Sequence, residues 1–218
     1  MHNYIFDLDG TLVNSSEEIL LCLKKAFKTV GYEIEESKFT ADIIGPPINN
    51  IIVNVAPELI DSEVSEQIMK SFRQIYDYDK NDISVLYDGV YDFVYGLKKA
   101  GKKLFIATFK PKIPTMRLVA KFFPNIFDDI YTIDKFEKPI TKEEMLKDII
   151  LRYNLDKSET VMIGDSISDI IAGKSAGITS VGVLWGYGFD KTKLLENADY
   201  TINKLEEMEC QKLNYQTI

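Results

Sequence analysis

Apolar residues follow two different spacings along the chain, and each spacing predicts a different kind of element. The short run Tyr4-Ile5-Phe6 has the aromatic and β-branched character of a buried strand. Two later segments carry apolar residues at helical spacing: Ile19, Leu23, Ala26, Phe27 and Val30 in the first, and Val64, Ile68, Phe72, Ile75 and Tyr76 in the second. Residues 14–84 are therefore predicted to form a small all-helical domain with no strand.

Local signals predict where these helices begin and end. Ser15 and Glu18 have the spacing of a capping box, with Ser15 as the N-cap, and Gly31 is expected to end the first helix. Gly45-Pro46-Pro47 predicts a rigid turn, followed by a short helix that ends before Pro57.

Strands and helices alternate after Tyr87, with short connections between them. The predicted strands cover residues 103–108, 130–133, 160–163 and 180–184, and the predicted helices cover 90–100, 113–122, 145–153 and 168–176. This alternation predicts an α/β fold, a Rossmann-like parallel sheet with helices on both faces. Residues 1–13 and 85–218 would form this core, and 14–84 the helical domain.

Composition narrows the classes of function. The 218 residues include 26 basic and 34 acidic side chains, a net charge of −8 that argues against binding to nucleic acid or to an anionic membrane. Two cysteines, Cys22 and Cys210, and one histidine, His2, are too few for a Cys/His zinc site. We expect neither a signal peptide nor a membrane span, and hence a cytoplasmic protein.

Polar side chains stand where the predicted strands end. Asp7 and Asp9 follow the first strand, Thr108 ends a second, and Asp165 follows a third, with Asp169 one helical turn later. Each has an ordinary structural explanation alone: a solvated Asp-Gly turn, a strand threonine, an N-cap and an exposed helix residue. Parallel strands bring their carboxyl ends to one edge of the sheet, so the five together favour a site.

The chemistry of this cluster favours magnesium and phosphate. Carboxylates without histidine or cysteine are hard oxygen ligands that suit Mg²⁺, which commonly bridges to phosphate oxygens. A phosphoryl dianion facing these carboxylates also needs a protein cation. Lys138 and Lys142 both precede the helix that leads to the third strand.

The motifs resemble those of the haloacid dehalogenase superfamily, in its phosphoglycolate phosphatase-like branch with a helical cap inserted after the first strand. The resemblance rests on Asp7-Leu8-Asp9-Gly10-Thr11, on a strand ending at Thr108, on a lysine before the following helix, and on Gly164-Asp165-Ser166 with Asp169. It covers nearly the whole chain and implies that 14–84 form the cap.

The resemblance also implies a role for each of these residues. Asp7 would be the nucleophile that forms an aspartyl-phosphate, and Asp9 the general acid and base. Thr108 would hold a phosphoryl oxygen. Mg²⁺ would be bound by Asp7, the backbone carbonyl of Asp9 and Asp165, with support from Asp169. The second aspartate favours phosphate-ester hydrolysis over carbon–halogen cleavage.

Some assignments within the resemblance are less direct. Lys142-Glu143-Glu144 is similar to the Lys-Gly-Glu form of the family and precedes Asp165 by 23 residues, as there, so Lys142 is preferred as the catalytic lysine over Lys138, which precedes Pro139. Lys110-Pro111 matches the family's Thr-Asn-Lys-Pro and implies a phosphate contact, but Phe109 replaces the asparagine.

Two loops complete the comparison. Gly45 and Pro46 are similar to the cap loop that reaches the substrate, and a plain turn explains them nearly as well. The loop from Trp185 to Gly188 is similar to a glycine-rich loop of the family, and also serves as a simple connection to the last helix.

The predicted function is a Mg²⁺-dependent phosphatase for a small phosphorylated metabolite, acting as a monomer or weak homodimer. The alternatives are a phosphomutase of the β-phosphoglucomutase type, a pyrophosphatase, and a non-catalytic binding protein that kept the fold.

Overall fold

The computed structural model describes residues 1–78, 82–138, 140–188 and 191–210, and the chain within it divides into two compact units. The sheet unit comprises Met1–Val13 and Leu86–Ile218, and the helical unit comprises Asn14–Val85. The boundary lies within one residue of the one expected from the sequence. No helix in the described ranges is both long enough and apolar enough to cross a membrane.

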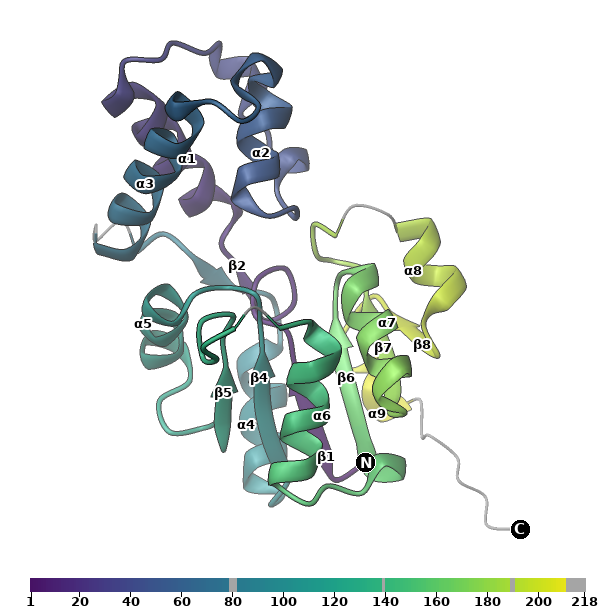
Figure 1. The fold of residues 1–218 in the computed structure, drawn as a ribbon. Coiled ribbons are helices and arrows are strands. Elements are labelled where there is room, and N and C mark those ends of the chain that lie inside the picture. Colours follow the sequence, from purple (N-terminus) through teal and green to yellow (C-terminus); the bar gives the residue numbers. More distant parts are fainter. Residues whose placement is uncertain (79–81, 139, 189–190, 211–218) are drawn as a thin grey trace. The chain divides into compact units, whose positions relative to one another are not determined.

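A six-stranded parallel sheet in the order β5-β4-β1-β6-β7-β8 forms the centre of the sheet unit (Figure 1). Its strands are β1 (Asn3–Phe6), β4 (Lys103–Ala107), β5 (Asp129–Tyr131), β6 (Thr160–Gly164), β7 (Thr179–Val183) and β8 (Tyr200–Ile202). The predicted α/β fold is confirmed. Strand β8 is the one that the apolar pattern did not indicate, because its three residues are too short for a periodic signal.

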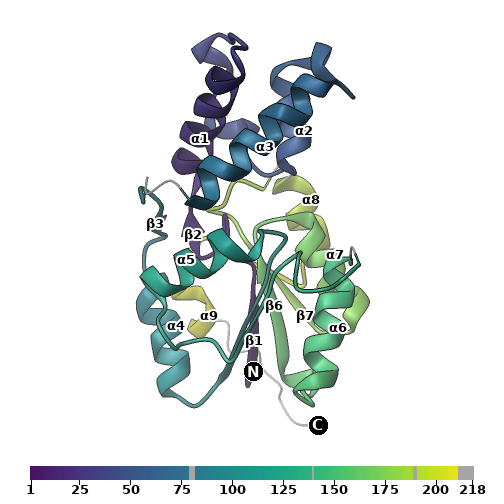
Figure 2. The ribbon, with the colours of Figure 1, turned by 60° about the vertical axis from the view of Figure 1, so that its left-hand side comes forward.

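Helices cover both faces of this sheet, as Figure 2 shows. The helices of the sheet unit are α4 (Val90–Lys99), α5 (Lys112–Phe122), α6 (Lys142–Arg152), α7 (Ile167–Ala176), α8 (Lys191–Asn197) and α9 (Glu207–Cys210), with the 3₁₀ turn η4 (Lys157–Glu159). Helices α4 and α5 pack against side chains such as Phe6 and Ile106, while α6 and α7 pack against Ile5 and Met162 of the opposite face. Successive strand residues point to opposite faces, so β1 contributes to both cores.

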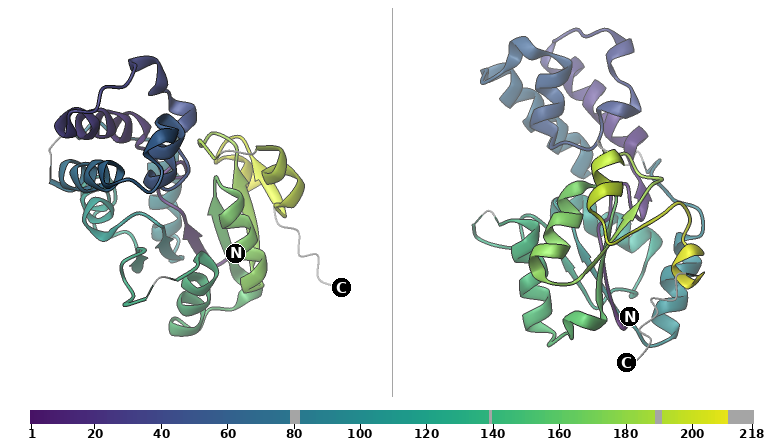
Figure 3. Two further views of the ribbon diagram at one scale, coloured as in Figure 1. Left: turned by 45° about the horizontal axis from the view of Figure 1, so that its top comes forward. Right: turned by 90° about the vertical axis from the view of Figure 1, so that its right-hand side faces the viewer.

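The helical unit is built from α1 (Ser16–Val30), α2 (Ile48–Val55) and α3 (Glu63–Tyr78), with 3₁₀ turns η1 (Glu36–Lys38), η2 (Ala41–Ile43) and η3 (Pro57–Leu59) (Figure 3). Helix α3 packs against both α1 and α2. The apolar faces that the sequence predicted are buried, including Leu23, Phe27, Ile68 and Phe72. Short strands β2 (Val13–Asn14) and β3 (Val85–Leu86) pair at the margins of the unit.

The predicted helix ends are confirmed at Gly31 and corrected at Ser15. Gly31 adopts φ +75°, and its N–H donates to the carbonyl of Lys28, as expected of a C-cap glycine. Ser15 precedes α1 but its side chain makes no capping hydrogen bond, so the expected capping box is wrong. The Glu18 carboxylate instead accepts hydrogen bonds from the backbone N–H and hydroxyl of Ser84, which is near the C-terminal end of the segment that forms the helical unit.

Candidate active site

The register of the central strands brings three polar segments to one edge of the sheet. Phe6 of β1 is level with Ile106 of β4 and with Ile163 of β6. Asp7, Thr108 and Asp165 follow these strands within two residues. Because the strands are parallel, the residues that follow them emerge side by side, as expected from the sequence.

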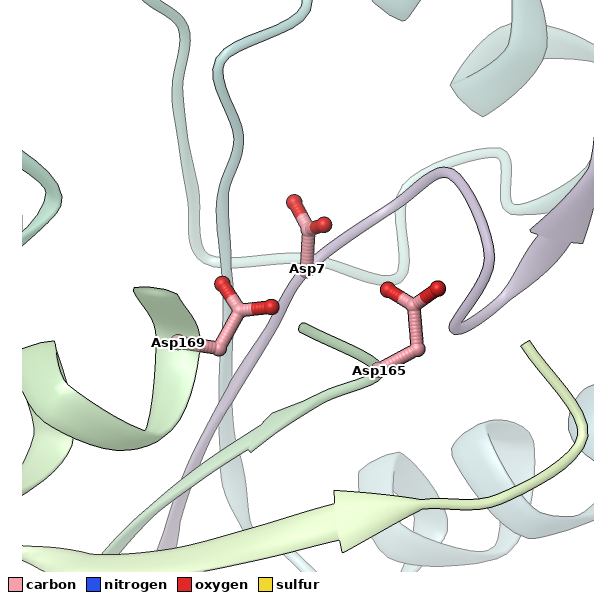
Figure 4. A group of neighbouring side chains, drawn as sticks. All are labelled: Asp7, Asp165 and Asp169. Carbon is pink, nitrogen blue, oxygen red and sulfur yellow. The ribbon is translucent and has the colours of Figure 1, made fainter. Parts of the chain in front are cut away.

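Three carboxylates meet at this edge. One carboxylate oxygen each from Asp7, Asp165 and Asp169 lies within 4.8 Å of the other two. Figure 4 shows the side chains converging from the loop after β1, from the end of β6 and from the start of α7. The cluster lies within the sheet unit.

Lys142 neutralises part of this charge. Its Nζ lies 2.9 Å from Oδ1 of Asp7 and 2.6 Å from Oδ1 of Asp169, and its side chain is 4% exposed. Three carboxylates face this one buried cation, a local imbalance of two negative charges when all are ionised.

The imbalance appears in the pKa values. Burial raises the pKa of Asp7 to about 6; Lys142 acts against this, whereas Asp169 and Asp9 add to it. Burial likewise raises the pKa of Asp165 well above its usual range, with Asp7 and Asp169 contributing. Burial disfavours the charge on Lys142, but Asp169 and Asp7 outweigh it and raise the pKa of the ammonium.

Asp169 is held at both oxygens. Its side chain is fully buried, Oδ1 accepts from Lys142, and Oδ2 accepts from the backbone N–H and the hydroxyl of Ser166 at 3.2 and 2.6 Å. Ser166 is the N-cap of α7 and forms a capping box with Asp169. A local helix-start motif thus fixes the carboxylate that orients Lys142.

Lys142 reaches the cluster because it is the first residue of α6. Thr141 caps this helix through a capping box with Glu144. Lys138, the other lysine considered from the sequence, is exposed in the preceding loop and makes no ion pair within the described residues, and Pro139 beside it lies outside them. The structure therefore brings Lys142, and not Lys138, to the carboxylates.

Asp9 has a separate cationic partner. The Nζ of Lys110 lies 2.8 and 3.1 Å from the two oxygens of Asp9. Thr108 is 2% exposed, and its Oγ1 accepts from the backbone N–H of Lys110 at 3.2 Å. The segment after β4 thus brings both a hydroxyl and a lysine to the site.

The loop after β7 contributes a contact for which the sequence holds no strong signal. The backbone N–H of Gly188 donates to Oδ2 of Asp165 at 3.0 Å. A Cβ on Gly188 would lie 2.0 Å from the carbonyl oxygen of Asp165, and one on Gly186 would lie 2.3 Å from its Cβ. The glycines let this backbone approach Asp165. Their spacing in the sequence was the only available signal.

A glycine also supports Asp165 from the first motif. Gly10 has φ +78°, and a Cβ there would lie 2.1 Å from Oδ2 of Asp165. Thr11 donates to Oδ1 of Asp165 at 3.4 Å. The Gly-Thr that follows the two aspartates therefore makes room for, and contacts, the carboxylate of the last motif.

Phe109 occupies the position where the sequence departs from the family pattern. Its ring is 44% exposed, and the Nζ of Lys142 lies 5.2 Å from the ring centre. An exposed aromatic ring thus lies beside the lysine that contacts Asp7.

Gly45 and Pro46 belong to the helical unit. Pro46 borders a groove of about 840 Å³ between α2 and α3, and Gly45 adopts φ +128°. Their expected contact with substrate stays a prediction.

The donors present fit a hard divalent cation. The donors of Asp7, Asp165 and Asp169 are all carboxylate oxygens, and the three negative charges exceed the single positive charge of Lys142 by two. Oδ1 of Asp7 is buried and accepts no hydrogen bond within the described residues, although Lys142 is close enough for an ion pair. Buried carboxylate oxygens are normally satisfied, so this oxygen is suited to a ligand.

Comparison with known proteins agrees with this geometry. A family model described as haloacid dehalogenase-like hydrolase matches residues 4–183. The pyrophosphatase PpaX of Bacillus velezensis is 30% identical over 209 residues, 94% of this chain and 93% of the relative. The phosphoglycolate phosphatase of Vibrio parahaemolyticus is 26% identical, covering 93% and 92% of the two chains.

Solved structures share the fold over nearly the whole chain. A predicted phosphatase from Clostridium acetobutylicum matches with a TM-score of 0.81 and 25% identity, covering 97% of this chain and 98% of that one. A predicted phosphoglycolate phosphatase from Haemophilus somnus matches with a TM-score of 0.84 and 23% identity, covering 96% and 97%. The second likeness concerns the fold alone.

Proposed function

Because the chain belongs to the haloacid dehalogenase-like hydrolase family, we propose that it is a Mg²⁺-dependent phosphatase that hydrolyses a small phosphomonoester through an aspartyl-phosphate. The observation that carries this proposal is the carboxylate of Asp7, whose Oδ1 is buried beside Lys142, with carboxylate oxygens of Asp165 and Asp169 within 4.8 Å. The name of one relative, the phosphoglycolate phosphatase of Vibrio parahaemolyticus, supports the same reaction.

In the first step, an oxygen of Asp7 attacks phosphorus and the bond between phosphorus and the leaving oxygen breaks. Asp9 gives its proton to that oxygen, so the product leaves as a neutral alcohol. In the second step, Asp9 takes a proton from water, which attacks phosphorus, and the bond to Asp7 breaks. Inorganic phosphate leaves and Asp7 is restored.

Thr108 and Lys142 stabilise the transferring group. The buried hydroxyl of Thr108 and the ammonium of Lys142 would each donate to a phosphoryl oxygen, where negative charge develops. The raised pKa of Lys142 keeps this group charged throughout the working pH range.

Asp7, the backbone carbonyl of Asp9 and Asp165 would hold Mg²⁺, with Asp169 in support. When bound, this cation offsets the surplus charge of the carboxylates, which lets a phosphate dianion approach.

The second candidate is pyrophosphate hydrolysis, since the relative at 30% identity is named a pyrophosphatase. Phe109 favours the monoester. When pyrophosphate is hydrolysed, the leaving group is a charged phosphate, to which the Phe109 ring beside Lys142 offers no hydrogen bond. When a phosphomonoester is hydrolysed, the leaving group is an organic alcohol, which the ring contacts favourably.

The helical unit, residues 14–85, is proposed to act as a cap that excludes water, with Gly45 and Pro46 contacting the substrate. A cap also allows the organic part of the substrate to be recognised away from phosphorus. The substrate would be a small phosphorylated metabolite.

Phosphate release from a panel of small phosphomonoesters and pyrophosphate tests the proposal, with Mg²⁺ and with chelator. We expect selective, Mg²⁺-dependent release that Asp7→Asn abolishes, because the amide keeps the shape of the side chain and removes the nucleophile. If the folded protein released no phosphate from any compound of the panel, a mutase or a binding protein would be favoured.

A further inference from the structure

Lys110 is a buried lysine at the site that the phosphoryl-transfer steps above do not use. Its side chain is 4% exposed, and its Nζ lies within hydrogen-bond distance of both oxygens of Asp9, at 2.8 and 3.1 Å. A contact to both oxygens restricts rotation of a carboxylate more than a contact to one. The Asp9 side chain itself is 21% exposed, so surrounding atoms do not pack it tightly.

The backbone of Lys110 is held at two points, and the next residue begins a helix. Its N–H donates to Oγ1 of Thr108 at 3.2 Å, and its carbonyl accepts from the fully buried Thr115 at 3.4 Å. Pro111, the next residue, is the N-cap of α5. These contacts join the end of β4 to the start of α5, so the lysine extends from a rigid base.

The two lysines of the site contact different carboxylates. Lys142 contacts Asp7 and Asp169, whereas Lys110 contacts Asp9. The resemblance of Lys110-Pro111 to the family's Thr-Asn-Lys-Pro implied that Lys110 contacts phosphate. The geometry associates it with the proton-transfer residue instead.

We propose that Lys110 is a positioning residue for Asp9. Lys110 holds the Asp9 carboxyl group where that group can exchange a proton with the leaving oxygen and then with water. This inference rests on the proposed function, because Lys110 acts only through the proton transfers of Asp9. Lys110 touches neither phosphorus nor the leaving group in this role.

The role has a kinetic consequence that a phosphate ligand would not share. Protonation of the leaving oxygen matters most when the leaving group is strongly basic. Phenyl phosphate and 4-nitrophenyl phosphate have nearly the same shape, but phenolate is much the more basic leaving group. A misplaced Asp9 should therefore slow phosphoryl transfer from phenyl phosphate far more than from 4-nitrophenyl phosphate.

The test compares kcat and KM on these two esters at saturating Mg²⁺ for the wild type, Lys110→Met and Lys110→Arg. We expect Lys110→Met to lower kcat/KM on phenyl phosphate at least about tenfold more than on 4-nitrophenyl phosphate, because kcat/KM reports the step that expels the leaving group, whereas kcat also includes the hydrolysis of the aspartyl-phosphate that both esters share. Lys110→Arg should restore part of the loss, since a guanidinium also contacts both carboxylate oxygens. Asp9→Asn should show the same selective loss.

Lys112→Met is the matched control, because Lys112 is exposed two residues later and should leave both rates unchanged. Equal losses of kcat/KM on both esters would overturn the inference and return Lys110 to phosphate binding or to a structural role. Should Lys110→Met fail to fold by circular dichroism, Lys110→Arg and Lys110→Gln provide the same ratio of rates.

The two proposals fail in different ways. If the Asp7→Asn variant still hydrolysed both esters, the proposed function would be disproved, and the inference with it. If Asp7→Asn were inactive but Lys110→Met slowed both esters equally, the inference alone would be disproved.

Discussion

At the scale of single residues, the site is defined by buried charges that are incompletely balanced. Asp7, Asp165 and Asp169 share Lys142, and the pKa values of Asp7 and Asp165 are raised, by burial first and by mutual repulsion second. Such a cluster destabilises the fold when no cation is bound, a cost that active sites commonly carry.

Asp7→Asn should stabilise the cation-free protein at neutral pH. The folded pKa of about 6 exceeds the ordinary value of 3.8, so the contribution of Asp7 to stability is full below pH 3.8 and is lost as the pH rises through about 6. The amide does not ionise, and we expect a gain of on the order of 1–3 kcal/mol in unfolding free energy at pH 7. Urea unfolding in chelator at pH 4 and pH 7 measures it; an equal effect at both pH values would contradict the assignment.

Lys142→Met and Lys138→Met should separate strongly in activity. Removing the Nζ beside Asp7 eliminates a donor to the transferring group and should lower kcat by roughly 10²-fold or more. Lys138 is exposed and outside the cluster, so its variant should stay within about twofold of wild type. Steady-state kinetics on one ester decide the matter, and a greater loss at Lys138 would reverse the choice of catalytic lysine.

At the scale of elements, helix starts and a close-packed loop position the charged groups. Helix α6 begins with the capping box of Thr141 and Glu144 directly before Lys142. Helix α7 begins with a box that includes Asp169 itself. The loop after β7 reaches Asp165 through Gly188.

Thr141→Ala should loosen the start of α6. The Oγ1 of Thr141 accepts from the N–H of Glu144 at 3.2 Å, and loss of such a cap costs about 1 kcal/mol of unfolding free energy. Because Lys142 is the next residue, we expect a several-fold decrease of kcat as well. Chemical unfolding and kinetics on the same preparation check both effects, and a stability loss with unchanged kcat would show that Lys142 is held by its ion pairs alone.

Gly188→Ala should impair the site through backbone crowding. The added Cβ would lie 2.0 Å from the carbonyl oxygen of Asp165, so the loop must move away and lengthen its hydrogen bond. We expect Mg²⁺ to bind more weakly, so that half-maximal activity needs a higher Mg²⁺ concentration, and we expect at least about a tenfold loss of activity. Gly96→Ala, within α4 and with open space around it, is the control and should stabilise by about 0.5–1 kcal/mol. Unchanged Mg²⁺ activation in Gly188→Ala would argue against a role for this loop.

At the scale of the whole molecule, the chain divides into two compact units, and the carboxylate cluster belongs to the sheet unit. A ligand that binds the folded sheet unit therefore stabilises that unit directly. The net charge of −8 adds a general preference for bound cations.

Saturating Mg²⁺ should raise the midpoint of thermal unfolding of the sheet unit. At 100 times its Kd, a ligand contributes about 2.7 kcal/mol, which corresponds to roughly 5–10 °C for a chain of this size. Calorimetry with Mg²⁺ and with chelator measures the shift. Asp165→Asn should reduce it strongly, and a shift of equal size in that variant would place the cation elsewhere.

Short-range patterns in the sequence were sufficient for the elements and for the class of fold. The apolar spacing of α1 and α3, the end of α1 at Gly31 and the alternation after Tyr87 all depend on neighbours within a few residues. The carboxylates could also be grouped, because parallel strands carry their carboxyl ends to one edge whatever the chain length between them.

Only the tertiary structure decided which side chains meet across long separations. Lys110 and Asp9 are 101 residues apart, and Gly188 and Asp165 are 23 apart. The pairing of Glu18 with Ser84, in place of the predicted cap at Ser15, has the same origin. The sequence already preferred Lys142 over Lys138, and the structure adds the contacts of Lys142 with Asp7 and Asp169. Each depends on strand register and helix placement, which fix distances that residue spacing does not encode, whereas the elements themselves follow from local periodicity.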